Sequence, residues 1–292
     1  MNAPPVYVVM LTWNRVDDTL ACIASLVQSS YQPIRIIVCD NGSTDGTPQV
    51  LRTSYPLIQI IELGHNHGFA AGANVGLRQA LADGADQILL INNDTIVAAS
   101  MVAHLVAAAA PDVGIVAPMI YFADAPNIIW SIGGLRSPWT LEQAGDWRGR
   151  CDRGAWPDIV ARDFVTGCAM LLSATALRTV GLFDERFFMY YEDSDLCVRM
   201  QRGGYRILMV PAARMWHKVA RSSGGADSSA ERYAMARSSV LFFRKHVRGW
   251  RWMIVGFFRL ASAVKTTLRL LRYRRLTASV NYWRGLLGGW RQ

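Results

Sequence analysis

Short apolar runs alternate with amphipathic segments along the first third of the chain. The apolar runs are typical of buried strands and lie at residues 6–12, 34–39, 58–63 and 88–91. The segments between them repeat apolar residues at helical spacing, as in the helix predicted from Val16 to about Ser29. Strands that alternate in this way with helices predict an α/β fold, with a mostly parallel sheet and helices on both of its faces.

The alternation weakens after a helix predicted at residues 98–109. Short strands are predicted at 114–118, 128–132, 164–172 and 207–210, and one further helix runs from about Tyr191 to a stop signal at Gly203-Gly204. Residues 133–157 form a long segment rich in Trp, Gly and Arg. Loops of this length usually carry function or are disordered, and the tryptophans favour a wall or lid over a linker.

Polar side chains end three of the predicted strands. They are Thr12-Trp13-Asn14-Arg15, Asp40-Asn41-Gly42-Ser43 and Asn92-Asn93-Asp94. Because the carboxyl ends of parallel strands share one edge of a sheet, these side chains can converge on one crevice. Asp40 is placed to accept the imide hydrogen of a uracil or thymine ring, and Asp94 to hold a divalent cation for a nucleotide diphosphate. For each residue taken alone, a turn or helix cap explains the pattern as well.

Gly68, Gly72 and Gly76 recur every four residues and therefore line one face of a helix. Close packing against a strand is sufficient to explain this spacing. The segment Asn66-His67-Gly68 at the helix entrance is also able to approach a phosphate or a ribose. The spacing matches neither the dinucleotide-binding fingerprint nor the P-loop.

Three carboxylates, on Glu192, Asp193 and Asp195, follow the aromatic run at residues 187–191. Like charges at this spacing repel one another unless a cation or a proton transfer uses them. A carboxylate beside an apolar wall can reach the pKa of a general base, whereas acids that stabilise a helix dipole are the alternative interpretation. His217, after a predicted strand, is either a metal ligand beside Asp94 or a hydrogen-bonded structural residue.

The basic character of the chain is confined to its last part. The net charge is +9, yet residues 232–292 contain 14 of the 31 Lys and Arg and no Asp or Glu. The remainder is net acidic and would repel a phosphate backbone, which argues against nucleic-acid binding. From Val240 to Leu271, large apolar residues mix with Arg and Lys as in a pair of interfacial helices, so we expect contact with an anionic membrane surface. A helical cap on the catalytic domain or on a partner subunit is the alternative.

The spacing of the cysteines and the length of the apolar runs bear on the compartment in which we expect the protein. Five scattered cysteines without a Cys-x-x-Cys pair fit neither a disulfide framework nor a zinc site, so a reducing compartment is expected. The N-terminal residues do not have the pattern of a secretory signal, and no apolar run approaches the ~20 residues of a membrane-spanning helix.

Several motifs in register carry a family resemblance over about residues 6–220. They include Thr12-x-Asn14-Arg15, Asp40-Asn41-Gly42-Ser43-x-Asp45-Gly46, Asn66-x-Gly68-Phe69-Ala70-x-Gly72-x-Asn74-x-Gly76, Asn92-Asn93-Asp94, Gly167-Cys168-Ala169-Met170-Leu171 and Tyr190-x-Glu192-Asp193-x-Asp195-Leu196-x-x-Arg199. With them the chain resembles the family 2 glycosyltransferases of GT-A fold, and in particular their rhamnosyltransferase-like branch.

The resemblance implies inverting sugar transfer from a nucleotide-diphosphate donor, with Mg²⁺ or Mn²⁺ bridging the diphosphate. Asp94 would bind the metal, with His217 as a second ligand, and Asp193 would be the general base, supported by Glu192. Asn92 departs from the family pattern, because many relatives have an acid there. An amide oxygen can still ligate a hard cation, at some cost in affinity.

The motif positions also assign binding roles. The nucleotide would be bound by Thr12, Asn14, Arg15, Asp40, Asn41, Gly68, Asn74, Asn92 and Asn93. The donor sugar or the acceptor would be bound by Trp130, Thr166, Gly167 and Tyr191. We divide the chain into a catalytic domain at 1–225, with a nucleotide-binding half at about 1–118 and an acceptor-binding half at about 119–225, and a basic amphipathic helical tail at 226–292.

The predicted function is therefore an inverting glycosyltransferase that moves a sugar to a glycan or lipid-linked acceptor. Family likeness suggests rhamnose, from dTDP-rhamnose, as that sugar. A nucleotidyltransferase on a similar sheet and an anionic-polymer-binding protein that acts through its tail are the alternatives. We expect a cytoplasmic enzyme, peripheral on the inner face of the cell membrane, and a homodimer is possible.

Overall fold

The parallel half of a ten-stranded sheet forms the N-terminal part of the fold, which is known here from a computed structural model that describes residues 3–218 and 228–291. Four strands run side by side and parallel in the order β4, β1, β2, β3. They are β1 (Val6–Thr12), β2 (Ile34–Asp40), β3 (Gln59–Glu62) and β4 (Gln87–Asn92). The four predicted strands are confirmed to within a few residues.

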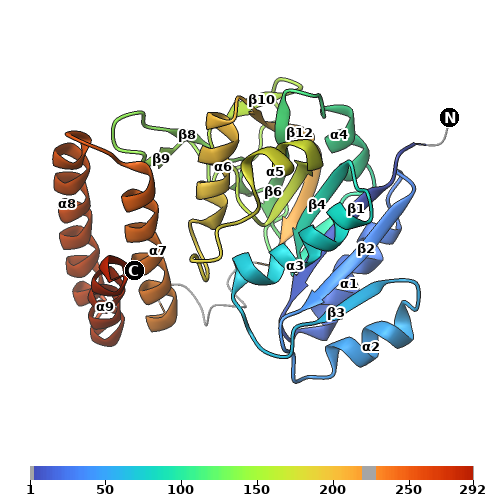
Figure 1. The fold of residues 1–292 in the computed structure, drawn as a ribbon, viewed down its shortest axis with the longest axis horizontal. Helices are drawn as coiled ribbons and strands as arrows, with labels where there is room; N and C mark the ends of the chain where they lie inside the picture. Colours follow the sequence, from blue (N-terminus) through green and yellow to red (C-terminus); the bar gives the residue numbers. More distant parts are fainter. Residues whose placement is uncertain (1–2, 219–227, 292) are drawn as a thin grey trace.

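Helices cover both faces of this sheet, as predicted. On one face, α1 (Val16–Val27), α2 (Thr47–Ser54) and α4 (Met101–Ala107) pack against alternate residues of β1, β2 and β4. On the other face, α3 (Phe69–Ala82), α5 (Ala174–Val180) and α6 (Glu192–Arg202) pack against the intervening residues (Figure 1). Successive side chains of a strand point to opposite faces, so a continuous apolar run such as that of β4 supplies both cores.

The second half of the sheet is mixed. Antiparallel β11 (Ala169–Ser173) lies between β4 and β6 (Val113–Phe122), and β12 (Arg206–His217) runs parallel to β6. The shorter strands are β5 (Thr95–Val97), β7 (Ile129–Ser131) and β10 (Val160–Arg162) in the main sheet, and β8 (Leu135–Arg136) and β9 (Gln143–Ala144) in a separate hairpin within residues 133–157. A mostly parallel α/β sheet is therefore confirmed.

Three elements differ from the sequence prediction. β12 continues past Pro211 to His217, because a register shift between Val210 and Arg214 absorbs the proline that cannot donate to the ladder. Residues 164–168, predicted as strand, precede β11 and carry only an isolated bridge from Phe164 to Gly134. The short helix α5 was missed, although Ser173 caps it by accepting a hydrogen bond from the N–H of Ala176.

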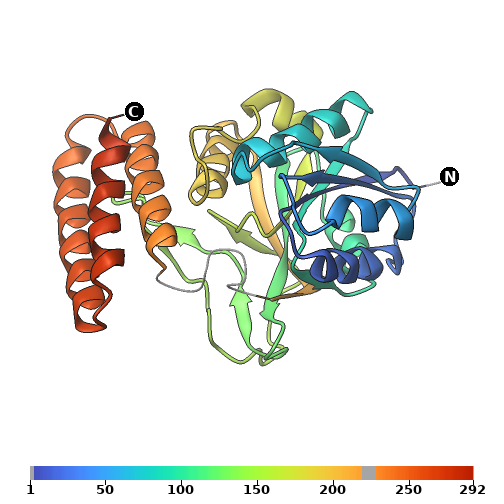
Figure 2. The same ribbon diagram turned by 90° about the horizontal axis from the view of Figure 1, so that it is seen from below.

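Residues 228–291 form three helices where a pair was predicted. They are α7 (Ser229–His246), α8 (Arg251–Arg272) and α9 (Leu276–Trp290), and they stand side by side at one end of the molecule (Figure 2). Gly285 lets α9 approach α7 closely, because a Cβ there would lie 2.4 Å from the carbonyl oxygen of Tyr233. The predicted boundary near residue 226 lies at residues 219–227, outside the described residues. No described helix is both long enough and apolar enough to cross a membrane.

Candidate active site

The carboxyl ends of β1, β2 and β4 lie together at one edge of the sheet. Thr12 pairs with Asp40 across β1 and β2, and Leu11 pairs with Asn92 across β1 and β4. The polar residues at the three strand ends therefore share one edge, and each can be assigned a contact.

Asp40 is almost completely buried at the end of β2. Its Oδ2 accepts a hydrogen bond from the backbone N–H of Ser43 at 3.0 Å, which is the turn interaction that the alternative interpretation predicts. Its Oδ1 is buried and has no hydrogen-bond partner among the described residues. Because a buried acceptor without a donor costs free energy, this oxygen is suited to the N–H of a ligand.

The turn after β1 is held in an unusual backbone conformation. Asn14 and Arg15 have φ of 59° and 64°, in the left-handed region that non-glycine residues rarely adopt. The side-chain oxygen of Asn14 accepts from the N–H of Thr44 at 2.8 Å, and the Asn14 N–H donates to Ser43 Oγ. These bonds tie the β1 turn to the β2 turn and form one continuous wall beside Asp40.

Thr12 and Asn93 lie beneath this wall. Asn93 Nδ2 donates to Thr12 Oγ1 at 3.1 Å and to Thr19 Oγ1 at 3.0 Å, and all three side chains are buried. The network joins the ends of β1 and β4 to α1. It stabilises this edge of the sheet, a structural role of Thr12 and Asn93 that the sequence pattern did not reveal.

The predicted nucleotide contacts through the side chains of Asn41 and Asn74 are not supported. Asn41 Nδ2 donates to Asn66 Oδ1 and to the carbonyl of Gly68, and its Oδ1 accepts from the N–H of His67. Asn74 forms hydrogen bonds in both directions with the backbone of Phe183. Both amides are satisfied within the protein, so they fix loops.

Gly68 is required by packing. Its φ is 84°, and a Cβ at this position would lie 2.4 Å from the carbonyl oxygen of Phe188. Gly72 and Gly76 press in the same way on the side chains of Leu11 and Val9. The packing interpretation therefore accounts for the four-residue glycine spacing, while Gly68 places the start of α3 directly against the loop that precedes α6.

Asp94 and His217 form the candidate metal site. His217 Nε2 lies 3.1 Å from Asp94 Oδ1, and both side chains are buried. The edge of the Trp130 ring contacts the His217 ring, with 4.5 Å between ring centroids. His217 Nδ1 and Trp130 Nε1 are buried without hydrogen-bond partners among the described residues. The structure thus brings Asp94, His217 and Trp130 together.

The donor set fits a hard cation only in part. Within residues 3–218 and 228–291, no group of three or more His, Cys, Asp or Glu side chains gathers as metal ligands. Mg²⁺ commonly uses one or two carboxylates and takes the rest of its ligands from substrate phosphates and water. Asp94 provides such a carboxylate, whereas the imidazole of His217 is a softer ligand than a hard cation prefers. Asn92 is fixed through its backbone, because its N–H donates to the carbonyl of Cys168 at 2.9 Å.

Asp193 lies at the start of α6, held by the segment before β11. Its Oδ2 accepts from the N–H of Gly167 at 3.1 Å, and its Oδ1 accepts from the N–H and the hydroxyl of Ser194. Thr166 supports this segment by accepting from the N–H of Cys168 at 3.4 Å. Burial raises the pKa of the Asp193 carboxyl above its usual range, and the hydrogen bonds from Gly167 and Ser194 oppose the rise.

Glu192 is more deeply buried than Asp193. Its Oε2 has no hydrogen-bond partner among the described residues. Burial, and next the negative charge of Asp193, raise the pKa of Glu192 well above its usual range. The pKa of Asp193 is raised less than that of Glu192, so Asp193 is the first of the two carboxyls to lose its proton as the pH rises.

Asp195 and Tyr191 make their contacts with α7. Asp195 is fully buried and lies 2.8 Å from Arg199 Nε, 2.7 Å from Lys245 Nζ and 2.7 Å from His246 Nε2. The Tyr191 ring packs on Phe242, with 5.3 Å between centroids, in a cluster between α6 and α7. The prediction that Tyr191 contacts the sugar or acceptor is not supported by this placement. The acidic motif thus divides into the pair Glu192 and Asp193 and an anchor for α7 at Asp195.

Two groups of residues around the acidic motif were missed from the sequence. Arg136, from β8, lies close enough that its positive charge lowers the pKa of Asp193, and Gln143 Nε2 donates to Ser194 Oγ at 2.7 Å. Lys245 and His246 at the end of α7 hold Asp195 from 50 residues further along the chain. No local signal marks these residues, because each contact joins segments that are distant in sequence.

The sequence model of glycosyl transferase family 2 matches residues 7–170. The chain is similar to the N-acetylglucosaminyl-diphospho-decaprenol L-rhamnosyltransferase of Mycobacterium tuberculosis, with 29% identity over 92% of this chain and 96% of that protein. It is also similar to the dTDP-rhamnosyl transferase RfbF of Shigella flexneri, with 21% identity over 98% of each.

Solved structures support the same fold. The mannosyltransferase PcManGT of Pyrobaculum calidifontis, in complex with GDP-Man and Mn²⁺, superposes with a TM-score of 0.61 and 19% identity over 95% of this chain and 74% of that chain. GalNAc-T7 with UDP, GalNAc and Mn²⁺ gives a TM-score of 0.63 and 16% identity over 83% of this chain and 50% of that chain. The predicted GT-A fold is thereby confirmed.

Proposed function

The chain belongs to glycosyl transferase family 2 and is a glycosyltransferase, and from this premise we propose that it moves rhamnose from dTDP-rhamnose to a lipid-diphosphate-linked sugar, with inversion at the transferred carbon. The donor follows the name of one relative and the acceptor class follows the name of the other. The assignment of Asp193 as the single base supports inversion.

One observation carries the proposal. The segment Gly167-Cys168 is bonded on one side to the carboxylate of Asp193, and on the other to the backbone of Asn92 at the end of β4. The acid at the start of α6 and the strand end that leads to Asp94 are thus fixed to the same two residues. This arrangement suits a reaction in which a diphosphate leaves on one side of a sugar and a hydroxyl attacks from the other.

Asp94 and His217 would hold Mg²⁺ or Mn²⁺ against the donor diphosphate, with Trp130 beside them. When bound, a divalent cation stabilises the charge that develops on the leaving diphosphate. The unpartnered Oδ1 of Asp40 supports recognition of a base N–H, and the thymine or uracil imide provides one. Arg15 and Asn14 would form the wall of the nucleotide site beside Asp40, and the ends of β1 and β4 at Thr12, Asn92 and Asn93 would support that wall from beneath.

Asp193 would take the proton of the acceptor hydroxyl. Burial raises the pKa of Asp193, which makes its carboxylate a stronger base, and the hydrogen bonds from Gly167 and Ser194 fix the carboxylate orientation. Glu192, with the higher preference for its protonated form, would support Asp193 without competing for the proton. A single base without a protein nucleophile gives direct displacement and therefore inversion.

The three-helix region supports membrane association. Along α8, the apolar residues Met253, Phe257, Leu260, Val264, Leu268 and Leu271 repeat at helical spacing, and all are exposed. The same region has 13 Lys and Arg in residues 237–291 and no acidic residue. Each basic group near an anionic leaflet contributes about 1 kcal/mol, so an apolar face with basic flanks is suited to the cytoplasmic leaflet of the cell membrane. A homodimer formed through this face is the competing expectation.

Transfer can be tested directly with a panel of nucleotide sugars in the presence of Mn²⁺. Polyprenyl-diphospho-N-acetylglucosamine serves as the acceptor. We expect dTDP-rhamnose to give a rhamnosylated lipid and free dTDP, with the anomeric configuration opposite to that of the donor. Retained configuration would exclude direct displacement, and a product that contains the nucleotide would indicate nucleotidyl transfer.

A further inference from the structure

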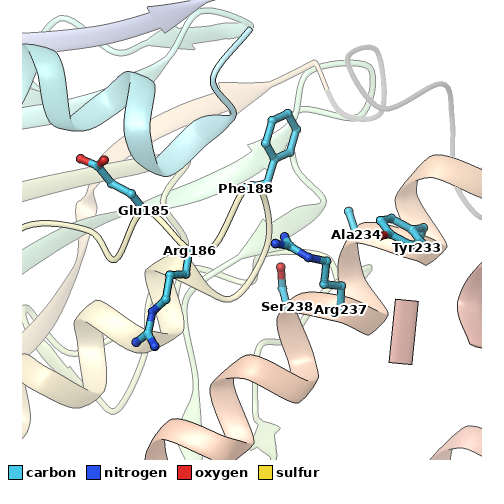
Figure 3. Close-up of a pocket in the computed structure, with 7 residues that line it drawn as sticks. All are labelled: Glu185, Arg186, Phe188, Tyr233, Ala234, Arg237 and Ser238. Atoms are coloured by element: carbon cyan, nitrogen blue, oxygen red, sulfur yellow. The ribbon is translucent and has the colours of Figure 1, made fainter. Parts of the chain in front are cut away.

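A pocket of about 620 Å³ lies between α7 and the loop at residues 185–188 that leads to the acidic pair (Figure 3). Its wall on the α7 side includes Tyr233 and Arg237, and its opposite wall includes Phe188. None of these residues belongs to the predicted nucleotide or metal sites. A volume of several hundred Å³ is typical of a site for a small organic ligand.

Arg237 provides the positive charge of this pocket that has no ion-pair partner among the described residues. Among the described residues, its guanidinium has neither a hydrogen bond nor an ion pair, and it reaches from α7 toward the 185–188 loop (Figure 3). The other charged residues of the pocket are neutralised elsewhere. Arg186 pairs with Asp184 at 2.6 Å, and Glu185 pairs with Arg78. The pocket is therefore suited to an anionic group, and a guanidinium matches the geometry of phosphate oxygens.

Two aromatic rings complete the lining. Phe188 and Tyr233 are 43% and 40% exposed, and they come from opposite walls. An aromatic face provides an apolar surface against which the C–H groups of a sugar ring can pack. Phosphate recognition by Arg237 and sugar contact with the rings would together fit a sugar phosphate.

A chain of contacts through Phe69 and Gly167 joins this pocket to Asp193. The carbonyl oxygen of Phe188 accepts from the N–H of Phe69 at 2.6 Å. A Cβ at Gly167 would lie 3.4 Å from the Phe69 ring and 3.6 Å from Asp193 Cβ, and Gly167 itself binds the Asp193 carboxylate. Ser238 Oγ donates to the carbonyl of Met189 at 2.8 Å and so fixes α7 to the same loop. The pocket wall and the base are thus parts of one packed unit.

We propose that this pocket binds the phosphorylated headgroup of the acceptor, with the Arg237 guanidinium on its phosphate and Phe188 and Tyr233 on its sugar. The proposal rests on the proposed function and specifies the acceptor site that the sequence left open. α7 forms one wall of the pocket and also packs with α8 and α9, and α8 carries the exposed apolar face. In this proposal, the lipid chain of a headgroup bound in the pocket lies along the three helices α7 to α9.

The test compares two acceptors, N-acetylglucosamine 1-phosphate linked to a short prenyl chain through a second phosphate, and a prenyl glycoside of N-acetylglucosamine without phosphate. In the wild-type enzyme, kcat/KM is expected to be higher for the phosphorylated acceptor. Arg237→Ala should raise the KM of that acceptor roughly 10- to 100-fold, as for the loss of a charge-assisted hydrogen bond, and leave the donor KM within about twofold. The preference between acceptors should shrink accordingly.

Arg248→Ala is the matched control, because it removes one exposed positive charge from the turn after α7 and leaves the pocket unchanged. Arg237→Lys keeps the charge but not the planar guanidinium, so its KM for the phosphorylated acceptor should fall between those of wild type and Arg237→Ala. A graded effect of the two variants would not be expected from a folding defect in Arg237→Ala alone. An unchanged acceptor preference in Arg237→Ala, or an equal effect of Arg248→Ala, would overturn the pocket assignment. If wild-type enzyme transfers to neither acceptor, it is the proposed function that fails.

Discussion

Removal of the His246 ring tests whether α7 is a structural part of the catalytic unit. The His246 side chain is 1% exposed, and its Nε2 lies 2.7 Å from Asp195 Oδ1, while Nδ1 lies 2.9 Å from the Arg202 guanidinium. Burial lowers the pKa of His246. The neutral ring with its proton on Nε2 donates to Asp195 and accepts from Arg202, so one tautomer satisfies both contacts.

His246→Ala should destabilise the protein by about 2–4 kcal/mol, the combined effect of a lost buried ring and of lost hydrogen bonds to charged groups. Asp195 keeps Lys245 and Arg199 as partners, so the larger cost of a fully unpaired buried charge does not arise. Urea denaturation at neutral pH gives the free energy of unfolding. His246→Gln, which can still donate to Asp195, should recover part of the loss.

The same residue gives a pH dependence of known sign. Since the folded-state pKa of His246 lies below its ordinary value of about 6.5, the unfolded chain binds the proton more readily. This contribution to stability is present above pH 6.5 and is lost as the pH falls through that value toward the folded-state pKa. Between pH 7.5 and 5.5, the free energy of unfolding of His246→Gln should therefore fall less than that of the wild-type protein. A change in unfolding free energy below about 0.5 kcal/mol for His246→Ala, or an unaltered pH profile for His246→Gln, would refute the coupling.

Two other perturbations address the metal and the membrane. Asp94→Ala should abolish the gain in dTDP affinity that Mn²⁺ provides, measured by calorimetry with and without the metal, and a gain equal to that of wild type would remove Asp94 from the site. Phe257→Ser combined with Leu268→Ser should lower binding to anionic vesicles in flotation by more than about 100-fold, because each large side chain that leaves the bilayer costs roughly 1.5–3 kcal/mol. Leu57→Ser is the control, because Leu57 is a fully exposed apolar residue outside the three C-terminal helices. If Leu57→Ser lowered vesicle binding as much as the double variant, the α8 face would be excluded as the membrane contact.

Periodicity was sufficient to predict the strands and helices of the first half. Each apolar run in β1, β2 and β4 is bounded by turn residues, and strand ends in a parallel sheet must share an edge, so Asp40 and Asp94 could be placed near one another without coordinates. The predicted strand at 207–210 is shorter than β12, which continues past Pro211 to His217. A bulge that absorbs a proline is set by pairing with β6, and pairing is not visible in one sequence.

Side-chain roles were less predictable than their positions. Asn41 and Asn74 occupy motif positions, yet their partners are backbone and side-chain groups of the loops at 66–68 and 183–185, which only the folded chain brings close. Asp195 was grouped with Asp193 because of sequence proximity. Two residues along α6 correspond to a rotation of about 200°, which directs Asp195 to Lys245 and His246 instead. This separation of neighbouring acids depends on a helix that lies 50 residues away.

The role of Asp193 as the base is tested most directly by the transfer rate of Asp193→Asn at saturating donor. The amide keeps the size of the side chain and one acceptor for Gly167 N–H, but it cannot take a proton. General base catalysis contributes about 10²- to 10⁴-fold, so kcat should fall by at least about 100-fold. The donor Kd, measured on the same protein, should stay within about twofold of wild type. Turnover at the wild-type rate would contradict the account.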